Sequence, residues 1–287
     1  MAGYSSGHGN DEAEGARNQR VMGDCHPTHL ETLNGREYKI ESLTPATFPG
    51  ALRVMKEALW KDEAVSIATK VNENPQAAEE LLELCADAAL DGVSLVAVAV
   101  KTGEVCSAMF NKIKVKWPSE KLFFEIFREE RCTQTSSRAL VDFMADVDRR
   151  CNLFELYNVD CSLDLMFLAT LQEYRKQKLG TLLLQYSIEV ARKVRDGAVV
   201  SISVADLGPK YSHLKKPKPI DTFPKICQAL VTVKETQKMF EKMKFNVHLT
   251  VSFSAHVFDG KKYTERLEDE NAVYQVTALP LYELEYA

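Results

Sequence analysis

Three basic side chains, Arg175, Lys176 and Lys178, lie in a turn between an apolar run at 163–169 and a helical pattern at 178–194. The apolar run is typical of a buried strand, so the order is strand, turn, helix. The first N–H groups of a helix lack partners within it, and that end of a helix carries partial positive charge. A basic turn at this point therefore predicts a site for an anion of phosphate size.

Other polar residues have ordinary structural explanations as well as functional ones. The acidic pair Asp62-Glu63 ends a helical pattern, where solvated carboxylates are common. His248 and His256 lack acidic or cysteine neighbours at ligand spacing, which favours packing or surface positions over a metal site. Lysine-rich residues 210–218 could contact nucleic acid, but their shortness and prolines favour a solvated loop, or a segment that overhangs an acceptor entrance.

The composition restricts the class of protein. The 287 residues carry a formal net charge of −5, which argues against a general binder of nucleic acid or membrane surfaces. No segment approaches the roughly 18 apolar residues that a membrane span requires. The seven cysteines are odd in number and include no C-x-x-C pair, which predicts reduced thiols in an intracellular protein. We therefore expect a cytoplasmic protein that folds as a monomer.

Periodicity predicts one domain at 31–287 behind a disordered tail at 1–30, which is rich in glycine and poor in large apolar residues. The predicted helices run from Thr44-Pro45 through Leu59, from Asn74-Pro75 to Gly92, from a cap at Ser136 or Ser137 to Cys151, and over 178–194 and 234–245. The predicted strands are Tyr38–Ile40, a hairpin of 93–100 and 105–115, and segments 163–170, 227–232, 247–257 and 272–284. Proline and lysine at 206–225 predict a long surface loop.

The order of these elements resembles the GNAT superfamily of N-acetyltransferases over roughly residues 38–284. Arg175 and Gly180 match the R/Q-x-x-G-x-G/A loop that holds the pyrophosphate of acetyl-CoA in that family, and Lys178 stands in place of the first glycine. The resemblance implies an α/β fold with a mixed sheet.

Within this superfamily the chain looks most like the arylalkylamine N-acetyltransferases of insects. Residues 59–65, Leu-Trp-Lys-Asp-Glu-Ala-Val, stand where those enzymes carry F-x-x-D-E-P-L. Thr232 and Thr236 stand at the positions of a serine pair, and Lys244-Phe245 stands at the position of a G-F turn. A lysine at position 178 costs about 1 kcal/mol if its φ is positive, although its ammonium could offset this by charge. A lysine at position 244 predicts a changed geometry at the end of its helix.

The resemblance also implies roles. An amine attacks the acetyl thioester as the free base, so Glu63 is the implied general base, and the hydroxyls of Thr232 and Thr236 are implied to bind the acceptor or the departing thiolate. Neither a cysteine nucleophile nor a metal is implied. The residues implied to bind acetyl-CoA are Leu168, Ala169, Thr170, Arg175, Lys176, Gln177, Lys178, Leu179, Gly180 and Thr181.

Two functions are consistent with these features. The first is acetyl-CoA-dependent N-acetylation of a small primary amine, with arylalkylamines such as dopamine, tryptamine or serotonin as the implied acceptors. The second is a non-catalytic acyl-CoA-binding or interaction protein that has kept the fold while its loop glycine was lost.

Overall fold

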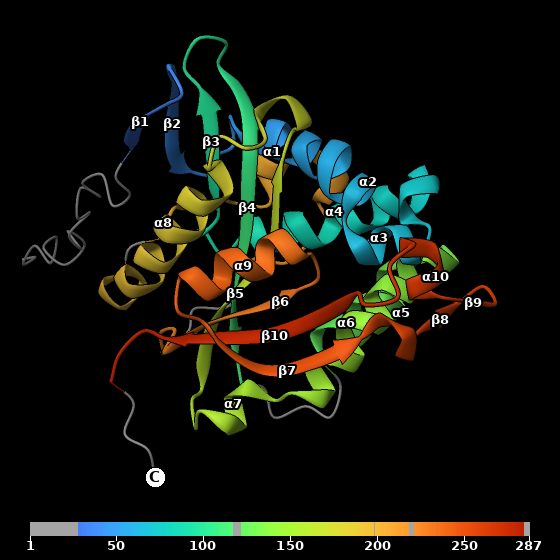
Figure 1. The fold of residues 1–287 in the computed structure, drawn as a ribbon. Helices are drawn as coiled ribbons and strands as arrows, with labels where there is room; N and C mark the ends of the chain where they lie inside the picture. The colour runs from blue at the N-terminus through green and yellow to red at the C-terminus, as the bar shows by residue number, and fades with distance from the viewer. Residues whose placement is uncertain (1–27, 117–121, 198, 218–220, 284–287) are drawn as a thin grey trace, which may run out of the picture.

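A mixed β-sheet forms the centre of the molecule (Figure 1). The computed structural model describes residues 28–116, 122–197, 199–217 and 221–283. Within them, eight strands pair in the order β1-β2-β3-β4-β5-β6-β10-β7. All neighbours are antiparallel except β5 and β6, which are parallel. The strands are β1 (His29–Leu33), β2 (Arg36–Ser42), β3 (Leu95–Ala99), β4 (Glu104–Val115), β5 (Cys161–Thr170), β6 (Ile226–Val231), β7 (Asn246–Ser252) and β10 (Val273–Pro280), with a separate pair β8 (Val257–Phe258) and β9 (Lys261–Lys262).

Helices cover both faces of the sheet, and the apolar core is correspondingly divided in two. The larger cluster lies between the sheet and α1, α3, α4, α5 and α6, and the smaller one lies under α8 and α9, which are in front of the sheet in Figure 1. No helix of the described residues has the length and apolar content needed to cross a bilayer. The helices are α1 (Phe48–Val54), a π-helical turn η1 (Met55–Leu59), α2 (Trp60–Asp62), α3 (Ala64–Ala68), α4 (Pro75–Ala89), α5 (Phe123–Arg131), α6 (Thr135–Arg150), α7 (Leu153–Leu156), α8 (Leu179–Lys193), α9 (Lys234–Lys242) and α10 (Tyr263–Leu267).

Several predicted elements are present with the expected end signals. Asn74 caps α4 by accepting from the Ala77 N–H at 3.1 Å, and Pro75 occupies the first position of the helix. The hairpin of β3 and β4 is present, and Gly92, which follows α4, has φ of 70°. These elements could be predicted because the contacts that start and end them are made between residues close together in the chain.

Other predictions were wrong at particular residues. The first helix begins at Phe48 rather than at Thr44, and β1 takes residues 29 and 30 from the predicted tail, of which residues 1–27 lie outside the described part. The predicted strand 247–257 ends at Ser252. Sequence reasoning missed α5 and α10.

The start of α6 was also predicted wrongly, and the reason is a contact from another helix. The helix begins at Thr135, and Glu80 of α4 holds the two residues just before it. The Glu80 carboxylate accepts from the N–H groups of Thr133 and Gln134 at 3.0 and 3.2 Å, from the Ser137 hydroxyl at 2.6 Å, and from the Thr133 hydroxyl. Ser137 is therefore a donor to a buried carboxylate and not a cap.

Replacing Glu80 with Gln is expected to lower the free energy of unfolding by about 2 kcal/mol, because an amide cannot accept all of these hydrogen bonds. Burial works to raise the pKa of Glu80, but the hydrogen bonds from Ser137, Thr133 and Gln134 outweigh it, so the pKa lies below its ordinary 4.5. The carboxylate therefore stabilises the fold above that value, and the contribution is lost as pH falls through the lower folded pKa.

Urea denaturation at pH 7 and at mildly acid pH measures this effect. Glu79→Gln is the matched control, since Glu79 lies beside Glu80 on α4 but pairs with Lys56 and Lys210 at the surface. That variant is expected to lose less than about 1 kcal/mol. Equal losses in the two variants would contradict the role of Glu80 in holding the start of α6.

Candidate functional site

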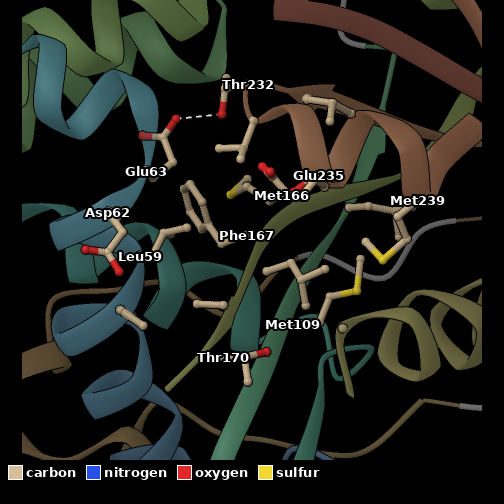
Figure 2. A pocket seen from close by; sticks show the side chains of 18 of the residues that line it. Leu59, Asp62, Glu63, Met109, Met166, Phe167, Thr170, Thr232, Glu235 and Met239 are labelled. Carbon is tan, nitrogen blue, oxygen red and sulfur yellow. Dashed lines mark hydrogen bonds between the residues drawn. The ribbon is translucent and has the colours of Figure 1, made fainter. Parts of the chain in front are cut away.

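The candidate site lies where β5 and β6 separate. The two strands pair only from Ser162 to Asp164 on β5 and from Ile226 to Gln228 on β6. Beyond this stretch β5 keeps β4 as its neighbour, and a cavity of about 620 Å³ opens on its other side. Figure 2 shows this cavity, with side chains of β5, α2, α9 and the segment after β6 around it.

A β-bulge at Met166 lets the cavity reach both faces of the sheet. Asn111 of β4 is paired with Leu165 and Phe110 is paired with Phe167, so Met166 has no opposite residue. Leu165 then belongs to the core under α8, whereas Phe167 belongs to the core on the opposite face. The cavity is lined from both cores, so two molecules could meet in it from opposite sides of the sheet.

The basic turn forms one end of the cavity. Lys176 and Lys178 both have left-handed backbone, with φ of 63° and 64°, and Lys178 is the N-cap residue of α8. Position 178, where the family carries a glycine, therefore has positive φ, which costs about 1–2 kcal/mol for a residue with a Cβ such as Lys178. Gly180 differs, because a Cβ built there would meet Leu168 Cδ2 at 3.5 Å, an ordinary contact.

The residues predicted to bind acetyl-CoA lie together, and all but Gln177 line the cavity. The Gln177 side chain instead accepts from Asn34 Nδ2 in the turn between β1 and β2, at 2.8 Å. The Arg175 guanidinium joins two parts of the cavity lining. Its Nη2 donates to Asp62 at 2.5 Å, and its Nε donates to the Thr170 carbonyl at 3.1 Å. Arg175 thus links the basic turn to α2.

Glu63 lies at the opposite wall and serves as the N-cap of α3. Its Oε1 accepts from the Val65 N–H at 2.9 Å and from the Thr232 hydroxyl at 2.6 Å, and its Oε2 accepts from the N–H and hydroxyl of Ser66 at 2.8 and 3.0 Å. Figure 2 shows the contact with Thr232, which comes from the segment after β6. These donors use the roughly four lone-pair positions of a carboxylate, so Glu63 is half-buried and fully hydrogen-bonded.

Sequence reasoning missed much of the apolar lining. Leu140, Phe143 and Met144 of α6 line the cavity, as do Trp60 and Phe167, whose rings meet edge to face with centroids 5.3 Å apart. Helical spacing identified the apolar face of α6, but only the fold places part of that face on the cavity. Met109, Met166, Met239 and the carboxylate of Glu235 also line the cavity, and each is labelled in Figure 2.

Neither family models nor curated proteins match this chain, but solved structures do. A putative arylalkylamine N-acetyltransferase 7 from Aedes aegypti superposes with a TM-score of 0.65 at 17% identity, covering 86% of this chain and 89% of that one. The chain has the GNAT fold. Arylalkylamine N-acetyltransferase 2 from the same mosquito gives 0.66 at 13% identity, and a polyamine N-acetyltransferase from Drosophila melanogaster gives 0.60 at 12%; each covers 85% of this chain and 99% of its own.

Lys244, the second lysine at a position where the family carries glycine, keeps the helix end that a glycine would give, contrary to the sequence prediction. Lys244 takes φ of 66°, its N–H donates to the Glu241 carbonyl at 3.0 Å, and the Phe245 N–H donates to the Phe240 carbonyl at 3.1 Å. This is a Schellman motif, closed by the Phe240 and Phe245 rings with centroids 4.7 Å apart. The geometry is kept because the paired rings and the two hydrogen bonds hold Lys244 in the left-handed region.

The loop at 206–225 does not line the cavity with any of its described residues. It packs instead on α1 and α4, where the buried Tyr211 meets Phe48 edge to face and Lys210 pairs with Glu79 at 2.6 Å. The alternative that this loop overhangs an acceptor entrance was therefore wrong for the described part. His248 donates to or accepts from the Tyr157 hydroxyl at 2.7 Å, and burial lowers its pKa.

Proposed function

We propose that this protein is an acetyl-CoA-dependent N-acetyltransferase that acetylates small primary amines with an apolar, arylalkyl body. The observation that carries the proposal is the cavity between β5 and β6, with cationic groups at one end and the Glu63–Thr232 hydrogen bond at the other. An acyl donor with a phosphate-bearing tail and an amine acceptor need opposite charges at the two ends of a shared site. The N-acetyltransferase structures with this fold support the same reaction class.

The donor half would hold acetyl-CoA mainly through backbone groups. The β5 backbone from Leu168 to Thr170 has β4 on one side and the open cavity on the other, which suits hydrogen bonds to the pantetheine amides. The N–H groups from Lys178 to Thr181 lie at the N-terminus of α8, which suits the pyrophosphate. Arg175 and Lys176 would add positive charge, with Arg175 exchanging Asp62 for a phosphate oxygen.

The acceptor half would prepare the amine for attack. A neutral amine attacks the thioester carbonyl carbon, and a C–N bond forms. The C–S bond breaks with its electron pair leaving on the CoA thiolate, which solvent can protonate, and the amine nitrogen loses a proton to a base. The Thr232 hydroxyl already donates to Glu63, so its oxygen can accept the amine proton while its own proton passes to the carboxylate. Thr232 would thus relay the proton, which lets Glu63 act as base while it keeps its bonds to α3.

The lining of the acceptor half favours an aromatic or aliphatic amine. Trp60, Phe167, Leu140 and Met144 offer apolar surface, and Asp62, Glu63 and Glu235 offer negative charge toward an arriving ammonium. Aromatic and methionine side chains pack favourably against the flat ring of an aromatic ligand. An arylalkylamine such as tryptamine combines the two features.

Calorimetry and a thiol-release assay together test this proposal. The protein is expected to bind acetyl-CoA and to release free CoA thiol only when an amine is added, with phenethylamine, tryptamine and dopamine as acceptors and agmatine as a comparison. The second candidate, a non-catalytic acyl-CoA-binding protein, is favoured by the full occupancy of the Glu63 lone pairs. It predicts binding of acetyl-CoA without release of thiol for any amine.

Lys178→Gly is expected to act on stability and on affinity in opposite directions. Removing the Cβ relieves the strain of the left-handed backbone. Glycine also raises the conformational entropy of the unfolded chain, which offsets part of this gain, so the free energy of unfolding should rise by about 0.5–1 kcal/mol. Removing the ammonium should weaken acetyl-CoA binding about three- to tenfold, most strongly at low salt.

Lys244→Gly is the matched control for this prediction, because Lys244 has the same left-handed backbone but does not line the cavity. It should raise stability by a similar amount and leave the acetyl-CoA dissociation constant unchanged. An affinity loss of the same size in both variants would place the effect in the fold and not in the phosphate contact.

A further inference from the structure

An aromatic cluster stands behind one wall of the cavity. Phe143 of α6 packs edge to face against His256 and Tyr274 with ring centroids 5.0 Å away in each case, and it stacks on Phe253 at 6.0 Å. Tyr263 of α10 completes the cluster at 6.1 Å. These rings come from α6, α10, β10 and the turn after β7, so they fix Phe143 from several directions.

Phe143 is the member of this cluster that lines the cavity. Its side chain is almost fully buried, and Phe253 and Tyr274, which lie behind it, are fully buried. Since Phe143 lines the cavity and the other four rings do not, Phe143 separates the open space from the cluster.

Charged groups surround the wall behind Phe143. Burial raises the pKa of Tyr263, and the charges of Glu63 and Asp142 act in the same direction; Asp142 pairs with Arg128 at 3.0 Å. His256 Nε2 and the Tyr274 hydroxyl are hydrogen-bonded at 3.0 Å, and burial lowers the pKa of His256, with a smaller contribution in the same direction from Arg150. The imidazole is therefore neutral near pH 7. Asp146 of α6 faces it as well, but pairs with Arg150 at 2.7 Å.

We infer that Phe143 is the specificity-determining residue that limits the length of the acceptor amine. This inference rests on the proposed function. The acceptor would lie with its amine toward Thr232 and Glu63 and with its apolar tail against the Phe143 ring. Because the ring is held by its neighbours and cannot move aside without disturbing them, a tail that is too long would be rejected.

The experiment compares wild-type protein, Phe143→Leu, Phe143→Ala and Phe253→Leu on a series of ω-phenylalkylamines from benzylamine to 4-phenylbutylamine. Phe253→Leu is the matched control, since Phe253 belongs to the same cluster, is fully buried and does not line the cavity. A methylene in an apolar pocket changes kcat/KM about 10- to 200-fold. We expect the ratio of kcat/KM for 4-phenylbutylamine over phenethylamine to rise at least about tenfold in the Phe143 variants and to stay unchanged in Phe253→Leu.

The outcomes separate this inference from the proposed function. Thiol release by the wild-type protein, with the same length preference in Phe143→Leu as in the wild type, would overturn the role of Phe143 alone. A similar shift in Phe253→Leu would also overturn it, because the preference would then follow from loosened packing. Absence of amine-dependent thiol release in the wild-type protein would contradict the proposed function itself. Phe143→Leu decides the question if Phe143→Ala does not fold.

Discussion

Glu63→Gln is expected to lower kcat about 100-fold or more while leaving the dissociation constant of acetyl-CoA within about twofold, because general-base assistance contributes roughly 10²–10⁴-fold. The amide can still accept from one N–H of α3 but cannot take a proton from the Thr232 hydroxyl. Thr232→Val should give a loss of similar size, since it removes the relay and keeps the shape. Steady-state kinetics across neutral and alkaline pH, with one accepted amine, measure both.

Ser66→Ala is the control for the structural part of this effect. Ser66 donates its hydroxyl to Glu63 Oε2 at 3.0 Å, so the variant disturbs the carboxylate without touching the Thr232 contact on Oε1. Its kcat should stay within about threefold of the wild type. If Glu63→Gln kept wild-type kcat over the whole pH range, Glu63 would be only the cap of α3.

Gly180→Val is expected to weaken acetyl-CoA binding at least about 30-fold, equivalent to about 2 kcal/mol, while the protein stays folded. Gly180 lies in the first turn of α8, beside the N–H groups that we propose as pyrophosphate donors, and its Cβ position faces Leu168. The branched methyl groups would extend from there into the space for the donor.

Gly180→Ala provides the comparison, because a single Cβ makes an ordinary 3.5 Å contact with Leu168 Cδ2. We expect this variant to bind acetyl-CoA within about threefold of the wild type. Calorimetry with both variants, after circular dichroism has shown that they are folded, measures the difference. Equal affinities for the valine and alanine variants would place the donor away from this turn.

Much of the fold follows from local patterns in the sequence. Asn74-Pro75 starts α4, and the apolar run before Arg175 is β5, because caps and buried strands depend on adjacent residues. The neighbours with the GNAT fold agree with the α/β class that the order of elements implied.

The predictions that were wrong or incomplete share a physical reason, which is contact between residues far apart in the chain. A carboxylate from α4 binds the residues just before α6 and the Ser137 hydroxyl, so the serines near its start misled the prediction. Two aromatic rings hold Lys244 in a backbone region that usually takes glycine. Periodicity marked Phe143 as apolar, but its place in the cavity depends on how α6 packs in the fold.

The candidate site, like the fold, could be predicted only where it depends on residues close together in the chain. The basic turn was recognisable because strand, turn and helix are consecutive, and its residues lie together along one cavity. The state of Glu63 was not recognisable, because its bond to Thr232 joins positions 169 residues apart. The separation of β5 from β6 is a property of strand pairing that no single segment encodes.

The most direct test of the central claim is a thiol-release assay with purified wild-type protein, acetyl-CoA and phenethylamine or tryptamine, with the acetylated amine identified by mass spectrometry. We predict thiol release that saturates with both substrates, stops when the amine is left out, and matches the N-acetyl product in amount. Binding of acetyl-CoA without amine-dependent thiol release or N-acetyl product, for these amines and for agmatine, would contradict the account.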